Sequence, residues 1–133
     1  MIETLASYKF PTAEVGLASL SVRIEKIASR LGVRVPEWLE DGLGPACGFA
    51  FRVVSGRVFV LMEHELSIRY ENAQGPDLLV DASDLATFGP DALITESVEA
   101  LGLSRSDLTW VADCDSQQAA AELAAKVRNQ SGQ

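Results

Sequence analysis

The chain has 133 residues, of which 47 % are hydrophobic and 23 % charged, and it carries a net charge of −8 at neutral pH. This length and composition predict one folded domain over residues 1–133 with its own core, with residues 1–10 and 129–133 as loose termini. No run of about eighteen apolar residues occurs, so no membrane span is expected. The opening MIETLASYKF lacks the apolar core of a secretory signal, so we expect a cytoplasmic protein.

The net negative charge comes entirely from the second half of the chain. Residues 1–70 hold eight acidic and eight basic side chains, whereas residues 71–133 hold eleven acidic and three basic ones. An acidic half of this kind repels nucleic acid and anionic membranes, and it attracts basic partners or divalent cations. The alternative is that the acidity serves solubility alone.

The first forty residues predict mainly helix. Residues 1–10 have no clear period and would form a short edge strand or a loose arm. A helix is predicted from Pro11-Thr12 to Gly32, because apolar residues recur there at helical spacing. These residues are Leu17, Leu20, Ile24, Ile27, Ala28 and Leu31. A second, short helix is predicted over residues 36–40, because proline suits its first position.

The strongest β-forming sequence follows, from Cys47 to Tyr70. Two apolar runs flank Ser55-Gly56, which predicts a hairpin with a two-residue loop. That loop would pair Phe51 with Val60 and gather six side chains on one apolar face: Phe49, Phe51, Val53, Val58, Val60 and Met62. The opposite face, which would carry Phe59 and Leu61, is expected to be half covered. Alternation continues to Tyr70, so the second strand would either bend or turn at residues 63–65.

The last part of the chain predicts a strand–helix–strand unit. The strands are expected over residues 78–80 and 108–112, with a helix from Gly89-Pro90 to Gly102 between them. A final helix would be capped by Asp115 or Ser116. Together these elements predict an α+β fold, in which a mixed sheet of an N-terminal hairpin and a C-terminal βαβ unit packs against three main helices.

Four aspartates form the candidate site. Asp81 and Asp84 follow one of the two late strands, and Asp113 and Asp115 follow the other. If those strands are parallel, their carboxyl ends meet at one edge of the sheet, where ligands commonly bind. Carboxylates there would suit Mg²⁺ or Ca²⁺, or equally the Lys and Arg side chains of a protein partner. Alternatively, Asp84 and Asp115 are helix caps and the other two are solvated strand ends.

Motifs for catalysis and cofactor binding are missing. Neither glycine-rich phosphate loop occurs, and Gly-x-Ser-x-Gly is absent, so no nucleotide cofactor and no serine nucleophile are expected. His64 is the only histidine and cannot assemble a histidine-rich zinc site. Cys47 and Cys114 are expected to be reduced and mainly buried. We therefore expect a protein without enzymatic activity and without a bound metal.

These properties favour a small acidic module that binds a basic protein partner. In size, acidity and lack of catalytic motifs the chain resembles bacterial toxin-neutralising immunity proteins, and that resemblance implies an inhibitor that occludes a basic site. One alternative is a divalent-metal-dependent or small-molecule-binding enzyme that uses the aspartate cluster. Another is a structural subunit that dimerises through the sheet face around Phe59 and Leu61. A monomer or weak homodimer is expected.

Overall fold

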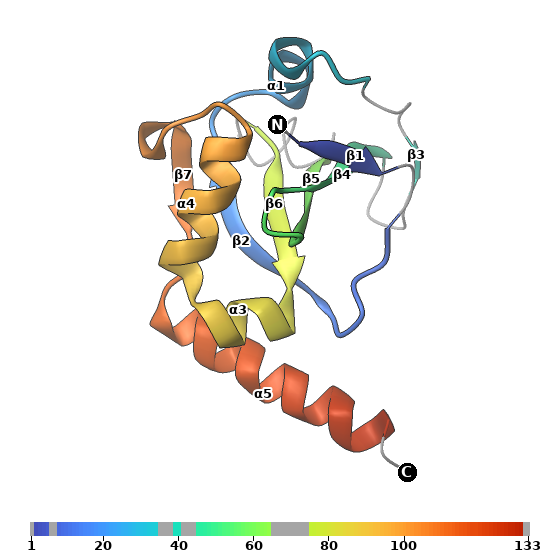
Figure 1. Cartoon of the computed structure of the whole chain (residues 1–133), viewed down its shortest axis with the longest axis vertical. Coiled ribbons are helices and arrows are strands. Elements are labelled where there is room, and N and C mark those ends of the chain that lie inside the picture. The colour runs from blue at the N-terminus through green and yellow to red at the C-terminus, as the bar shows by residue number, and fades with distance from the viewer. Residues whose placement is uncertain (1, 6–7, 35–38, 41–44, 65–74, 132–133) are drawn as a thin grey trace.

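The computed structural model describes residues 2–5, 8–34, 39–40, 45–64 and 75–131 of the chain. They form one α+β domain, which confirms the predicted fold class (Figure 1). The strands are β1 (Glu3–Leu5), β2 (Glu14–Leu20), β3 (Leu39–Glu40), β4 (Pro45–Arg52), β5 (Val58–His64), β6 (Asp77–Asp81) and β7 (Leu108–Val111). The helices are α1 (Ile24–Leu31), α3 (Ala82–Phe88), α4 (Pro90–Ala100) and α5 (Cys114–Ser131), with a short 3₁₀ turn at Arg105–Asp107.

The sheet has the strand order β1-β4-β5-β6-β2-β7, and β3 pairs with β4. Every pairing between these described strands is antiparallel, so the predicted mixed sheet is corrected to an antiparallel one. β6 and β7 are both antiparallel to β2, which lies between them. They therefore run in the same direction, as predicted, but do not form an adjacent parallel pair. The chain crosses from β6 to β7 through α3 and α4 over the inserted strand.

The predicted helix over residues 11–32 is wrong in its first half, because Glu14–Leu20 is strand β2 in the middle of the sheet. A register shift between Gly16 and Ala18 breaks the strand alternation, so that Leu17, Ala18 and Leu20 are all buried. Together with the buried residues of α1, these positions recur at intervals that resemble the apolar face of a single helix. Only α1 is helical, and it ends at Gly32 as predicted, with φ of 69°.

The predicted hairpin is present, but its register is wrong by one residue. Val53 accepts a hydrogen bond from the Gly56 amide at 2.9 Å, and Gly56 has φ of 94°. The loop is therefore three residues long, Val54 to Gly56, and Phe51 pairs with Phe59 instead of Val60. Because side chains alternate between the two faces, this shift turns the whole of β5 over.

The turned strand places Phe59 and Leu61 in the main core, where both are fully buried. Phe59 stacks on Phe51 with ring centroids 5.7 Å apart. The predicted half-covered face around these two residues is therefore corrected, and dimerisation through them is ruled out by their burial. The members of the opposite face are covered in a second, smaller cluster: Phe10, Ala50, Val58 and Val60.

All four described helices contribute to the main core on one face of the sheet. Its largest fully buried side chains come from every layer: Phe51, Phe59, Leu17, Leu20, Ile24, Ile27, Leu61, Leu78, Leu85, Leu93, Ile94 and Leu101. Apolar burial contributes about 25 cal/mol for each Å² removed from water, so this cluster is the main source of stability. No described helix is long and apolar enough to cross a membrane.

Two ion pairs connect the hairpin to the helices. Glu63, which the register shift brings to the core side, is fully buried and accepts two hydrogen bonds from Arg23 at 2.9 and 3.0 Å. Arg57 donates two hydrogen bonds to Glu96 on α4, at 2.7 and 2.9 Å. The Arg57 guanidinium also lies over the ring of Phe88, 4.4 Å from its centroid.

The C-terminal half follows the prediction closely, apart from α3, which the sequence analysis missed. α4 extends from Pro90 to Ala100, β7 and α5 occupy the expected places, and α5 continues into the segment expected to fray. At the other terminus, β1 is the edge strand that was one of two alternatives. Cys47 is buried as expected, but Cys114 is exposed. The short helix predicted over residues 36–40 is wrong at its end, because Leu39–Glu40 is strand β3 paired with β4. Residues 36–38 and the predicted continuation of β5 into residues 65–70 lie outside the described residues.

Candidate functional site

The ends of β6 and β7 lie at the same edge of the sheet, where α3 and α5 also lie (Figure 1). The prediction placed Asp81 and Asp84 after one strand and Asp113 and Asp115 after the other, and the chain does bring all four to this side. β2 separates the two strands, so the end of β6 at Asp81 and the end of β7 are two strand spacings, about 10 Å, apart. Each pair has a different environment.

Asp81 is a buried structural carboxylate. Only 6 % of the residue is exposed, and its Oδ1 accepts hydrogen bonds from the backbone amides of Thr12 and Ala13 at 3.2 and 3.0 Å. Its Oδ2 accepts a third bond from the Ser83 hydroxyl at 2.8 Å. These bonds attach the segment before β2 to the end of β6. Asp81 was predicted as a partner-binding residue, but it has little surface to offer a partner.

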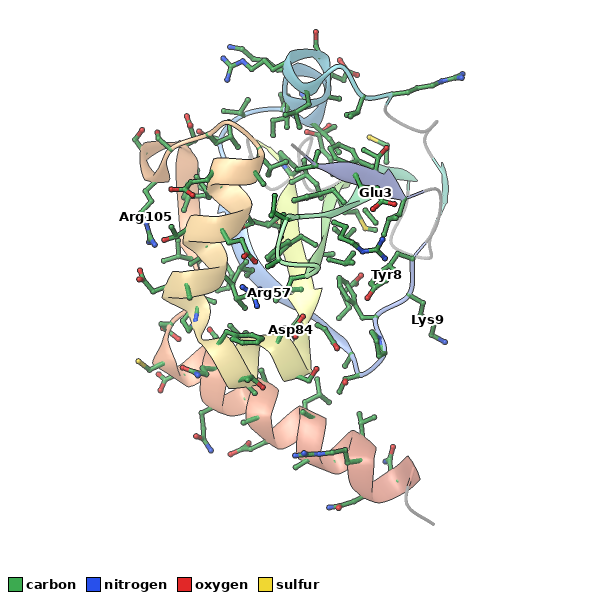
Figure 2. The ribbon with its side chains drawn as sticks, viewed as in Figure 1. Glu3, Tyr8, Lys9, Arg57, Asp84 and Arg105 are labelled. Atoms are coloured by element: carbon green, nitrogen blue, oxygen red, sulfur yellow. The ribbon has the colours of Figure 1, made fainter. Side chains whose placement is uncertain are left out.

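Asp84 lies in the first turn of α3 and is half-buried. Burial raises the pKa of its carboxyl group above the usual range, and the negative charge of Asp81 raises it further, while Arg57 opposes the shift. Figure 2 shows Arg57 and Asp84 close together, with Tyr8 on the N-terminal segment facing them. The pKa of Tyr8 is also raised, first by burial and then by Asp81 and Asp84.

Asp84 and Tyr8 could exchange a proton, but the neighbouring cation, Arg57, is already bonded to another carboxylate. The Nε and Nη2 groups of Arg57 donate to the two carboxylate oxygens of Glu96. The guanidinium of Arg57 also stacks on the ring of Phe88. Such a bidentate, stacked arginine holds the hairpin turn against α3 and α4. The surroundings of Asp84 therefore support the fold, and we assign it no catalytic step.

Asp113 is the N-cap of α5, a role that the sequence analysis gave to Asp115 or Ser116. Its Oδ1 accepts the Ser116 amide at 2.9 Å, and the Asp113 amide donates to the Ser116 hydroxyl at 3.2 Å. Hydrogen bonds from Ser116 hold the pKa of Asp113 below its usual range. Both Asp113 and Asp115 are exposed, and both stabilise the positive end of the helix dipole.

The four aspartates thus share an edge of the sheet but differ in environment, from the buried Asp81 to the exposed Asp113 and Asp115. Within the described parts of the chain, no group of three or more His, Cys, Asp or Glu side chains is placed to hold a metal ion. Partner binding by Asp84, Asp113 and Asp115 stays a prediction. Of these, Asp113 and Asp115 are the exposed ones.

One exposed residue near this edge was not singled out from the sequence. Trp110 on β7 has 49 % of its surface exposed, and the neighbouring Val111 has 42 %. A tryptophan in a predicted strand would ordinarily be assigned to the core, so the strand pattern alone gave no signal. Its exposure follows from the position of β7 at the end of the sheet.

Comparisons with known proteins leave the function open. No protein-family model matches the chain, and neither the search of curated proteins nor that of solved structures found a significant match. The function must therefore be argued from the surface itself.

Proposed function

We propose that this chain is an acidic protein-binding module, which places the carboxylates at the junction of β7 and α5 against a basic surface of a partner. The observation that supports this role is the exposure of Asp113 and Asp115 at the start of α5 and of Glu122 in its third turn. None of the three forms an ion pair with another residue that the structure describes. The chain is a binding protein in this proposal and not an enzyme.

Open carboxylates of this kind suit electrostatic docking. Exposed acidic groups attract a basic partner over about 8 Å at physiological salt and speed its association. The chain-wide charge of −8 adds to this attraction. The finer form of the proposal is an inhibitor that covers a basic site on its partner, as an immunity-type protein would.

The test is calorimetric titration with a deca-arginine peptide at two salt concentrations. The variant Asp113→Asn/Asp115→Asn removes two charges from the junction and keeps the helix cap, since asparagine caps as well as aspartate. The matched control Glu25→Gln/Glu99→Gln removes two exposed charges from α1 and α4. We expect the junction variant to lose affinity several-fold more than the control, and both to weaken with salt.

Equal losses in the two variants would show attraction to net charge alone, and they would contradict the proposed junction. Absence of measurable binding at low salt would contradict a protein-binding role based on charge.

A further inference from the structure

Trp110 lies on the face of the sheet opposite the helices. Its backbone pairs with Ser19 of β2, and its indole lies against Gly16 of the same strand. A Cβ atom placed on Gly16 would be 3.7 and 3.9 Å from two atoms of that ring. The glycine therefore leaves a flat stretch of backbone on which the indole rests, while about half of Trp110 remains open to solvent.

Two exposed carboxylates flank this indole on the same face. Glu14 precedes Gly16 by two residues of β2, so the two residues share a face about 7 Å apart. Asp77 of β6 pairs with Ser19, and its Oδ1 accepts a hydrogen bond from the Ser19 hydroxyl at 2.7 Å. Asp77 is thus two strand spacings, about 10 Å, from Trp110.

Neither carboxylate is paired with a described cation. Glu14 and Asp77 are exposed, and neither forms an ion pair with another described residue. Two other described arginines are paired with different acids: Arg57 with Glu96, and Arg105 with Asp91. An aromatic ring between two unpaired carboxylates is complementary to a positively charged side chain.

We infer that Trp110, Glu14 and Asp77 form a recognition patch for an arginine of an extended basic segment in a partner protein. The inference rests on the proposed function and identifies the chemistry of the partner. Tryptophan is the best ring for a cation–π contact, and a guanidinium can stack on it while donating hydrogen bonds to a carboxylate at its edge. Exposed tryptophans of this kind commonly contribute much of the binding energy in an interface.

Charge complementarity decides between the partners that such a face could take. A second copy of this chain would bring another net charge of −8 to a patch that already holds two carboxylates, so self-association is opposed. A basic segment is attracted by the same charges. Trp110 also precedes the exposed Asp113 by three residues, so a bound segment that follows β7 would reach both regions.

The fluorescence of Trp110 tests the patch directly. The chain has two tryptophans, so Trp38→Phe leaves Trp110 as the only indole. We expect deca-arginine to change the emission of this variant, with the same saturation as the calorimetric titration. Deca-lysine, which cannot stack a planar cation, should bind more weakly.

Affinity measurements give the second readout. Trp110→Leu and Glu14→Gln/Asp77→Asn should each weaken deca-arginine binding about fivefold, which corresponds to the roughly 1 kcal/mol of an exposed cation–π contact or charge pair. The control Glu25→Gln/Glu99→Gln should change it far less. If Trp38→Phe does not fold, the two indole N–H signals in the ¹⁵N spectrum of the unmodified chain replace the fluorescence, with Trp110→Phe assigning one of them.

The outcomes separate this inference from the proposed function. If deca-arginine binds but the Trp110 signal does not move and Trp110→Leu binds equally well, the patch is refuted and the acidic junction remains. If no binding occurs at low salt, both fail. Equal binding of deca-lysine and deca-arginine would refute the stacking contact.

Discussion

The ion pair between Arg23 and the buried Glu63 offers the sharpest test of the fold. Glu63 is fully buried, whereas half of the Arg23 side chain is exposed. Besides its two bonds to Arg23, the Glu63 carboxylate accepts the backbone amide of Ile24 at 3.2 Å. The Glu63 carboxylate therefore caps the first turn of α1, where the side chain of the N-cap residue Arg23 makes no capping hydrogen bond. Replacing Arg23 should therefore lower the free energy of unfolding more than replacing Glu63.

Arg23→Met leaves a charged Glu63 in the core with a single described donor, the Ile24 amide. Breaking a buried pair in this way costs about 3–5 kcal/mol. Glu63→Gln removes the charge, keeps an acceptor for Ile24 and lets Arg23 return to water, so it should cost only about 1–2 kcal/mol. Arg52→Met breaks an exposed pair with Glu3 and should cost less than about 1 kcal/mol.

Urea denaturation measures these differences as free energies of unfolding. For a domain of this size, each kcal/mol lowers Tm by roughly 4 °C, so Arg23→Met should melt about 12–20 °C below the parent. The order Arg23→Met, then Glu63→Gln, then Arg52→Met follows from burial alone. If Arg23→Met cost no more than Arg52→Met, the pair would behave as a surface contact, and the argument from burial would be wrong.

Three further results are expected. Gly48→Ala should cost about 3 kcal/mol or more, measured by urea denaturation, because the new Cβ would meet the Leu61 carbonyl oxygen at 2.2 Å; a Tm within a few degrees of the parent would contradict this. A thiol reagent at pH 8 should modify only the exposed Cys114 in the folded chain, because burial and nearby acids raise the pKa of Cys47 to about 11; two fast-reacting thiols would refute it. Asp113→Ala should lower Tm at neutral pH through loss of the cap, and because the folded pKa of Asp113 is depressed, the difference should shrink as the pH falls through and below the usual carboxyl range; a difference independent of pH would argue against the cap.

The candidate aspartates show which features of the site local sequence patterns can predict. The strand before Asp81 and the strand before Asp113 were each predicted from the sequence. Their common direction was an assumption of the candidate site, and the pairing of both strands with β2 shows it. Sequence could not show that Asp81 would be covered by the Thr12–Ala13 backbone, because that contact joins residues 68 and 69 positions apart. Burial, which decides whether a carboxylate can reach a partner, depends on such distant contacts.

Trp110 illustrates the same point for the proposed recognition patch. Its strand was predicted, but its exposure depends on β7 being the last strand and on Gly16 lying beside it. Both facts come from the pairing of β2 with β7, and the sequence had assigned β2 to a helix. An error in one long-range pairing therefore concealed a surface feature ninety residues away.

By itself, the sequence determined the α+β class, the C-terminal order of strand, helix, strand and helix, and the acidic charge of the second half. These properties depend on composition and on patterns within about twenty residues, which act before distant parts of the chain meet. Only the tertiary structure decided the register of the hairpin, the conversion of residues 14–20 into a central strand, and which acids are buried. The physical reason is that a single extra residue in a turn or a bulge reverses the face of every side chain beyond it, and only packing against distant strands and helices selects between the two faces.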